Sequence, residues 1–263
     1  LEEKENNLKP VEKAFGETVN IIFGKDVGNL FSLEGYLTKH VRRIRKTGSC
    51  ISGREVYYSG LLLDSILADS GRALKLDEFD SVSASRDWPG EMKIGEQALA
   101  DKPKLIEKVG YFCTERTHQS RNISGCVPSE YASDCYEIGR AYFSKLSAYS
   151  FWPRDCDHVF GCDSIRNSSF CINCYNSYKL TRCFEADTSQ NCSGSYFIHN
   201  CENVHDSTFC FNAKNLRYAI GNVEVGRERY LQVKQAVINE IAAKLEKEND
   251  FSLDIYNVGT KKG

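Results

Sequence analysis

The sequence predicts an α+β protein whose main body is a β-solenoid, flanked by an N-terminal α/β region and a C-terminal amphipathic helix. Three observations support this. Cysteines recur every nine residues, at Cys183, Cys192, Cys201 and Cys210. The residues three and six places after them are small or apolar, and the other six positions of each nine-residue row hold most of the polar and aromatic residues. A helix needs a period near 3.6, so this pattern is typical of stacked β-coils.

The nine-residue register covers residues 117–218, which we take as the solenoid domain. Ten of the twelve cysteines occupy the first and fourth positions of the rows, and the seventh position holds only Ala, Ser, Val, Ile and Leu. These three positions are expected to point inward. Three extra residues, Leu180 to Arg182, interrupt the register and are expected to bulge outward from one coil.

The coil length follows from the length of an extended chain. Nine residues at about 3.3 Å each are too short to enclose an interior, which favours two rows, about 18 residues, per coil. Residues 117–218 would then form five or six coils, at about 18 residues each.

The cysteine ladders have three interpretations. Cysteine behaves as a small buried hydrophobe, so in a narrow coil it can alternate with Ser, Ala and Val, which is the mixture observed. Disulfides between stacked coils and metal ligation are the alternatives. Cys171 and Cys174 form the only C-x-x-C pair and are the only candidate metal ligands, although zinc needs four convergent ligands.

Residues 1–116 show no such register and are predicted to be an N-terminal arm and α/β region that caps the base of the solenoid. We expect a helix over Phe31–Lys46, a strand over Glu55–Ser59, a short helix over Leu61–Ala68 and a loop over Phe79–Lys102. The polar first dozen residues are expected to be disordered in an isolated monomer.

Residues 219–263 are predicted to form a C-terminal helix and tail. An apolar stripe marks a helix over Arg227–Glu248, and Asp250–Val258 has the composition of a strand. Such a helix either folds back over the last coil or docks on a neighbouring subunit.

Composition and motifs give no indication of an enzyme. The net charge of −2 provides no attraction to nucleic acid, and no apolar run is long enough to span a membrane. The five histidines have no partner at a recognisable catalytic spacing, and no phosphate-binding, dinucleotide-binding or nucleophile-elbow motif is present. We therefore expect no catalytic residue, no cofactor and no membrane span.

The run NCENVHDSTFCFNAKNLRYAIGN, followed by the amphipathic helix that begins near Arg227, resembles uncharacterised cysteine-rich repeat proteins of archaea, candidate-phyla bacteria and their viruses. The resemblance covers the C-terminal part of the chain. It implies a structural or virion protein and carries no known activity.

The favoured function is therefore a non-enzymatic structural protein that self-assembles into a larger particle or lattice, such as a virus or phage capsid. It is expected to be a homo-oligomer joined through the N-terminal arm and the C-terminal helix. One alternative is a metal-binding or redox module that uses the cysteine ladders. The other is a carbohydrate-binding surface protein, using aromatic residues predicted to be exposed: Tyr175, Tyr178, Tyr196, Phe197, Phe209 and Phe211.

Overall fold

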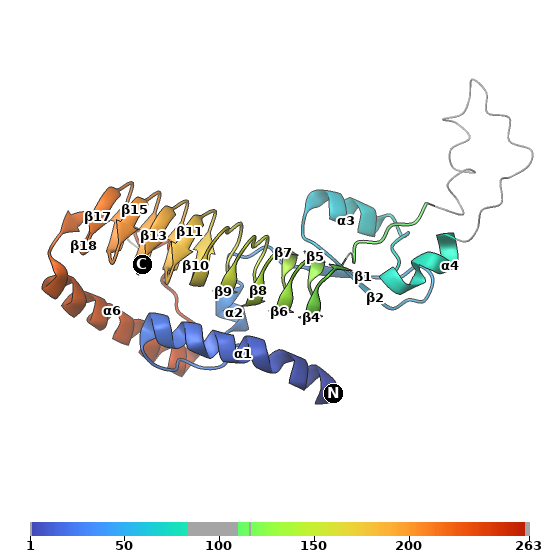
Figure 1. Ribbon diagram of the computed structural model, residues 1–263, viewed down its shortest axis with the longest axis horizontal. Coiled ribbons are helices and arrows are strands. Elements are labelled where there is room, and N and C mark those ends of the chain that lie inside the picture. Colours follow the sequence, from blue (N-terminus) through green and yellow to red (C-terminus); the bar gives the residue numbers. More distant parts are fainter. Residues whose placement is uncertain (1, 84–109, 116, 261–263) are drawn as a thin grey trace, which may run out of the picture.

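The predicted β-solenoid is confirmed. The computed structural model describes residues 2–83, 110–115 and 117–260, with the backbone alone for 2–7 and 83. A solenoid of about nine turns forms a rod, and two long helices, α1 (Glu2–Phe23) and α6 (Arg227–Glu248), run along one side of it (Figure 1). None of the helices in the described ranges is long and apolar enough to cross a bilayer.

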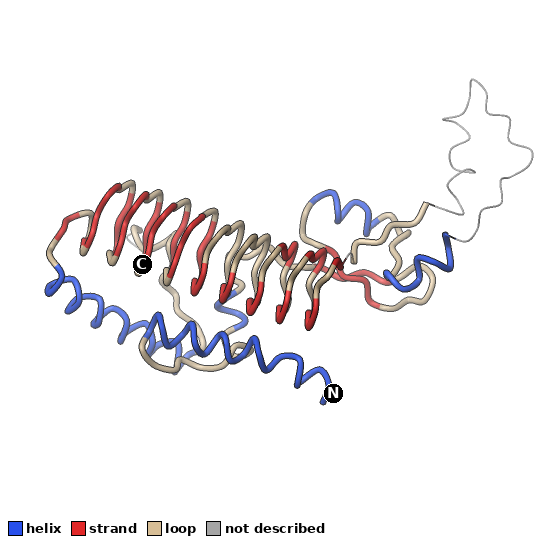
Figure 2. Tube along the Cα trace, viewed as in Figure 1, coloured by secondary structure: helices blue, strands red, loops and turns tan. Residues whose placement is uncertain are grey.

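The solenoid strands are short and mostly four residues long, and the tube in Figure 2 shows them stacked along the rod. They are β3 (Thr117–His118), β4 (Arg121–Ser124), β5 (Val127–Glu130), β6 (Ser133–Tyr136), β7 (Gly139–Tyr142), β8 (Lys145–Ala148), β9 (Asp157–Phe160), β10 (Ser169–Tyr175), β11 (Tyr178–Thr181), β12 (Phe184–Asp187), β13 (Gln190–Ser193), β14 (Tyr196–His199), β15 (Glu202–His205), β16 (Thr208–Phe211), β17 (Lys214–Arg217), β18 (Ala219–Ile220) and β19 (Val223–Glu224).

Each coil contains 12 residues, so the predicted coil of 18 is wrong. Parallel strands pair each residue with the residue 12 positions later, as in Ser133 with Lys145 and Tyr196 with Thr208. The coil closes early because every third residue from Gln119 to Gly221, except Pro128, has a positive φ. Each such residue turns the chain, so four three-residue steps complete a circuit that an extended chain could not.

Every step has an inward, an outward and a corner position. Inward residues are those whose numbers are multiples of three, the outward position follows, and the corner residue has the left-handed conformation. Asn, Asp and Gly tolerate this conformation best. They are frequent at the corners: Asn122, Asp134, Asn167, Asn173, Asn176, Asn191, Gly194, Asn200, Asn203, Asp206, Asn212, Asn215 and Gly221.

The inward positions confirm the predicted packing of the cysteines. The ten cysteines of the register are all buried and line the axis with Ser, Ala, Val and Ile. Leu180 is buried too, and its stretch pairs in register with β13, so residues 180–182 do not bulge. Because an insertion of three residues keeps the three-residue period, it adds one more step to the coil.

Inward Ser and Cys side chains also complete the backbone hydrogen bonding. Ser150 Oγ donates to Ala148 O at 2.9 Å and accepts from Cys162 N at 3.1 Å. Cys162 Sγ repeats this one coil later, donating to Phe160 O at 3.4 Å and accepting from Cys174 N at 3.4 Å. Buried backbone groups need such partners. Hydroxyl and thiol are therefore alternatives for one structural task.

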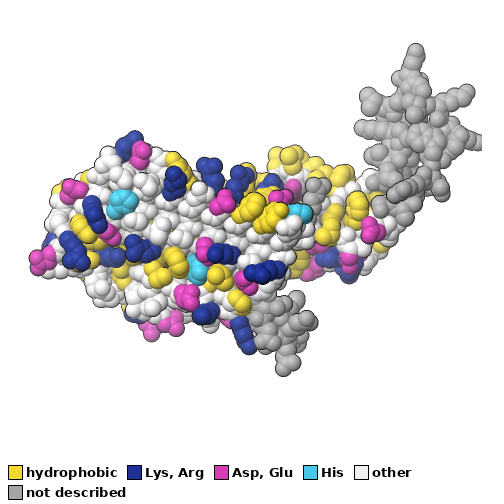
Figure 3. Space-filling model, in the orientation of Figure 1, with side chains coloured by type: hydrophobic (Ala, Val, Ile, Leu, Met, Phe, Trp, Pro, Cys, Tyr) yellow, Lys and Arg dark blue, Asp and Glu magenta, His cyan; other side chains and the backbone are white. Residues whose placement is uncertain are grey.

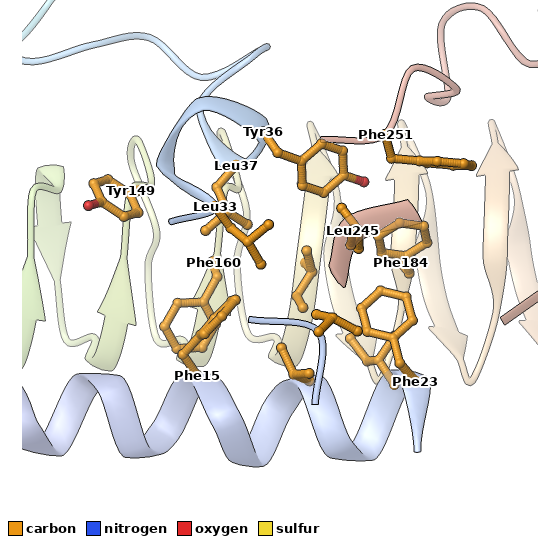
Figure 4. Close-up of a cluster of buried hydrophobic side chains, with 14 of the residues drawn as sticks. Phe15, Phe23, Leu33, Tyr36, Leu37, Tyr149, Phe160, Phe184, Leu245 and Phe251 are labelled. Atoms are coloured by element: carbon orange, nitrogen blue, oxygen red, sulfur yellow. The ribbon is translucent and has the colours of Figure 1, made fainter. Parts of the chain in front are cut away.

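Helices cover one side of the rod and create a second core. Outward residues at the same place in successive coils face α1, α6 and the short helix α2 (Glu34–Leu37). Phe15 of α1 meets Phe160 edge-to-face, with ring centroids 5.1 Å apart, and Phe23 meets Phe184 at the same distance. Figure 4 shows these rings between the helices and the coils. The N-terminal segment is therefore a docked helix, and the predicted disorder of its first dozen residues is wrong.

The rest of the N-terminal region differs partly from expectation. The predicted helix over Phe31–Lys46 is reduced to α2, and residues Arg45–Gly48 form β1, which pairs with β2 (Glu55–Tyr58). The predicted strand and short helix are confirmed as β2 and α3 (Leu62–Asp69). Phe79–Ser83 is helical (α4), after the 3-10 turn η1 (Leu76–Glu78), and most of the predicted loop lies outside the described residues. Thr114 Oγ1 donates to Tyr57 O, which joins β2 to the chain entering the first coil.

The predicted C-terminal helix is confirmed as α6, and it docks on the chain's own solenoid. Its Tyr230 hydroxyl donates to Gly194 O at 3.1 Å. The predicted strand over Asp250–Val258 is wrong, because this segment forms turns around Asp254, whose carboxylate accepts from Tyr256 N and Asn257 N.

A buried carboxyl group, Glu185, joins the solenoid to two other segments. Its Oε1 accepts from Tyr36 Oη of α2 at 3.1 Å and from Asn173 Nδ2 at 3.0 Å, and its Oε2 accepts from Ile255 N at 2.9 Å. Desolvation raises the pKa of Glu185 to about 7, although these three hydrogen bonds lower it.

The inward ladder predicts opposite effects for two substitutions. Cys192→Ser should lower the free energy of unfolding by only about 1–2 kcal/mol, because a hydroxyl can replace the thiol that donates to Gln190 O. Ser195→Phe should prevent folding, because Ser195 is fully buried in a narrow axis. Circular dichroism with urea denaturation measures both. The control is Ser193→Phe at the neighbouring outward position, which should fold. Loss of folding in Cys192→Ser together with loss of bound zinc or iron would contradict this account.

Glu185 predicts a pH dependence of stability. Because its folded pKa of about 7 lies above the value of 4.5 expected for an unfolded chain, the native state binds more protons between these pH values. The free energy of unfolding should therefore fall by about 3 kcal/mol as the pH rises from 4.5 to 7, and should not fall further above that. Urea denaturation midpoints across pH 4.5–8 measure this decline.

The matched variants are Glu185→Gln and, as a control, Glu130→Gln at an exposed corner-side position of β5. The first should remove most of the decline whatever its effect on absolute stability, and the second should retain it. An unchanged decline in Glu185→Gln would show that another group is responsible.

Candidate functional site

The side of the solenoid that carries Arg154 and Arg166 holds a groove of basic and aromatic residues. Trp152 occupies a corner, and Arg154, Arg166 and Tyr178 occupy the same outward place in three successive coils. Three hollows lie along this side. One of about 370 Å³ lies around Arg154 and Arg166, and it adjoins one of about 470 Å³ toward α2 and one of about 350 Å³ toward β17.

Aromatic rings hold the guanidinium groups of the groove. The Arg154 guanidinium lies 4.6 Å from the Trp152 ring centroid, and that of Arg166 lies 5.7 Å from the Tyr178 ring. Arg140 also lies over Trp152, at 5.3 Å, and its Nη1 is 3.9 Å from an Asp64 oxygen. Within the described ranges, Arg154 and Arg166 have no carboxylate partner, so their charges are available to a ligand.

The adjoining hollow toward α2 contains a neutralised acid. Asp163 accepts from Arg42 Nε at 2.9 Å and from the Arg42 backbone N at 3.1 Å, and Ser164 Oγ accepts from Arg42 at 2.7 Å. The hydrogen bond from Asp163 raises the pKa of Arg42. Arg42 also lies 4.0 Å from the Phe151 ring centroid. This pair anchors the chain after α2 to the solenoid, and Asp163 adds no free negative charge to the groove.

Two buried donors in this region lack partners. Trp152 Nε1 and the Tyr175 hydroxyl make no hydrogen bond with any described residue, and both side chains line the hollow toward α2. Burial raises the pKa of Tyr175 far above its ordinary value, so its hydroxyl keeps its proton. His40 lies edge-on to Tyr175, and its Nε2 is 3.0 Å from Asp254 Oδ2.

The chemistry of this arrangement is binding. It presents two guanidinium groups, an indole N–H and a phenol O–H, and the amide of Asn176 donates to Asp187 Oδ1 at 3.0 Å. These are donors and positive charges, which suit a ligand with anionic and hydroxyl oxygens. Among the described side chains of the groove we find no nucleophile paired with a base, which is what covalent catalysis requires.

The sequence-predicted metal candidates lie elsewhere. Cys171 and Cys174 are fully buried in the axis, where Cys171 Sγ donates to Ser169 O at 3.3 Å and Cys174 Sγ to Ile172 O at 3.5 Å. Desolvation raises the pKa of Cys174 well above its ordinary value, and it raises the pKa of Cys192 to about 11. Metals bind thiolates, and these groups are held as thiols. The described residues contain no group of three side chains suited to a metal, and the ten inward cysteines form no disulfide.

Most aromatic residues proposed for a carbohydrate surface are not exposed. Tyr175, Tyr196 and Phe197 are buried, the last two beneath α1 and α6, and Phe209 and Phe211 pack against the same core. Only Tyr178 lies on the uncovered side. His158, also expected outside, is buried with Nε2 3.3 Å from Glu17 of α1. The helices cover these outward positions, which a repeat pattern alone could not reveal.

Sequence reasoning missed the groove because it used a row of nine residues. In a row of 12, Tyr142, Arg154, Arg166 and Tyr178 fall into one column, in which two arginines lie between two tyrosines. That column was the available signal.

Comparisons of the chain with protein-family models, with curated proteins and with solved structures found no match. The functional conclusions therefore rest on the geometry described above.

Proposed function

We propose that the protein is a non-enzymatic structural subunit that assembles with further copies of itself into a larger particle or lattice. The observation that carries this proposal is an exposed apolar face on α3. Leu62 is 75% exposed, Leu63 73% and Ile66 56%. Figure 3 shows hydrophobic side chains gathered over this part of the rod. A contiguous apolar surface of this kind usually marks an interaction site.

The body that carries this face is suited to assembly because its interior groups are already used. Inward hydroxyls and thiols hydrogen-bond to the backbone of their own and neighbouring coils. Outward amides form ladders between coils, as from Asn191 to Asn203 and from Asn203 to Asn215. A rigid body loses little conformational freedom when it associates, which favours repeated contacts.

The partner that this face suits is a second copy of the chain. Charges of both signs surround α3: Asp64 is 3.9 Å from Arg140, and nearby Arg54 pairs with Asp77 at 2.9 Å. A two-fold contact brings the same surface together from both sides, so a rim with both charges can pair with itself. Fully burying a leucine or isoleucine side chain contributes about 1.5–3 kcal/mol.

The N-terminal arm and the C-terminal helix have less support as the joining elements. The apolar faces of α1 and α6 are buried against the chain's own solenoid, including Phe15, Val19, Ile241 and Leu245. Their outer faces are mostly polar, with Leu231 of α6 (42% exposed) as an exception. A contact through α6 therefore stays a prediction, which a Leu231 variant tests separately.

The nature of the particle is proposed from the sequence resemblance, which favours a virus or phage shell. The alternative of a metal-binding or redox module is less well supported, because the cysteine ladders are protonated thiols that hydrogen-bond to the backbone.

Sedimentation velocity over a range of concentrations tests the proposal. The wild-type chain should sediment as a species larger than its monomer mass of 29.8 kDa, and Leu63→Glu/Ile66→Glu should be monomeric, because burying two carboxylates opposes association. Leu231→Glu should assemble like the wild type.

A wild-type chain that stays monomeric at every concentration would refute self-assembly. Assembly that survives in Leu63→Glu/Ile66→Glu but is lost in Leu231→Glu would transfer the contact from α3 to the C-terminal helix. Circular dichroism of each variant confirms that the solenoid is retained.

A further inference from the structure

We propose that the groove around Trp152 binds an acidic saccharide, meaning a sugar chain that carries carboxylate groups. This site is separate from the α3 face, and the inference does not depend on self-assembly. It uses the two adjoining hollows that share Trp152, Ser164 and Asn176.

Charge gives the first argument. Arg154 and Arg166 occupy the same outward place in adjacent coils, so their attachment points lie about one strand spacing apart, about 4.8 Å. The rings of Trp152 and Tyr178 hold their guanidinium groups, and no described carboxylate neutralises them. Two oriented guanidinium groups at this separation suit a single carboxylate or two on neighbouring sugars.

Unsatisfied donors give the second argument. Tyr175 is 2% exposed, and its hydroxyl has no partner among the described residues. Trp152 Nε1 is likewise inaccessible and unpartnered. Leaving a buried donor unpaired costs about 1–3 kcal/mol. Sugar hydroxyl and ring oxygens are acceptors that can satisfy such donors while the carboxylate meets the arginines.

Size and location agree with a saccharide. The two hollows, of about 370 and 470 Å³, each lie within the range of small-molecule sites, about 300–1,000 Å³. The third hollow continues along the same side toward β17, so a ligand longer than one sugar can extend over several coils.

A nucleic acid fits the groove less well. Binding a strand needs a continuous basic track and open aromatic faces for base stacking. Here the Arg154 guanidinium already lies over the Trp152 ring, and that of Arg166 lies over Tyr178. The column of the two arginines has Glu130 at one end, and at the other Glu202 pairs with Lys214 at 2.7 Å. Two unpaired charges are too few for a strand that carries a phosphate on every nucleotide.

Isothermal titration calorimetry with trigalacturonate, at fixed low salt, tests the proposal on the full chain. Trigalacturonate should bind in the micromolar to millimolar range, and maltotriose, which lacks carboxylates, should bind at least tenfold more weakly. Single-stranded poly(dT) provides the nucleic-acid comparison.

The groove variant is Arg154→Gln/Arg166→Gln, which should weaken trigalacturonate binding at least tenfold, because each charged hydrogen bond contributes about 1.5–3 kcal/mol. The matched control, Arg227→Gln/Arg229→Gln at the start of α6, removes the same charge from exposed positions and should bind like the wild type. Trp152→Phe keeps a ring but loses the indole N–H, and it should reduce affinity severalfold.

Three outcomes would overturn the proposal. They are no heat of binding at millimolar trigalacturonate, equal weakening in the groove and control variants, and tighter binding of poly(dT) than of trigalacturonate. The last would identify the groove as a nucleic-acid site. Circular dichroism shows whether each variant keeps its fold, and because all the substituted side chains point outward, the solenoid should remain intact.

Discussion

The left-handed residue at every third position is the constraint on which the rest of this structure depends. It turns the chain tightly enough for 12 residues to close a coil, and it fixes which side chains face the axis. Most residues pay about 1–2 kcal/mol for this conformation. Stacking offsets that cost, because each corner N–H reaches a carbonyl of the preceding coil, as Asn200 N does at Asp187 O. A single coil would keep the strain and lack the bonds, so only a stack is stable.

The narrow axis that results explains the cysteines. An inward side chain must be small, and it must satisfy backbone groups that the tight turns leave without partners. Serine and cysteine can do both, while alanine, valine and isoleucine supply apolar contact where no such bond is needed. The same burial keeps the thiols protonated and separates them from solvent. An abundance of cysteine here therefore reflects packing and backbone hydrogen bonding.

Outside the axis, the two sides of the rod have different roles. The helices α1, α2 and α6 bury large aromatic rings against one side, and Glu185 ties α2 and the C-terminal segment to the same coils. This second core stiffens the rod and consumes most of its outward aromatic residues. The uncovered side keeps arginines, amides and two unpartnered donors, which is why ligand binding is proposed there and assembly is proposed at the α3 face.

The sequence by itself determined that residues 117–218 form a solenoid, which residues line its axis, and that a long amphipathic helix follows. These properties are local, because any coil whose length is a multiple of three places the same residues inward. For that reason the inward pattern could not distinguish 9, 12 or 18 residues per coil, and the coil length depended on backbone turns seen only in three dimensions. The tertiary structure alone decided that α1 and α6 cover one side, which buried Tyr175, Tyr196 and His158. It also brought Arg154 and Arg166 beside Trp152, because stacking makes neighbours of residues that lie 12 positions apart in the chain.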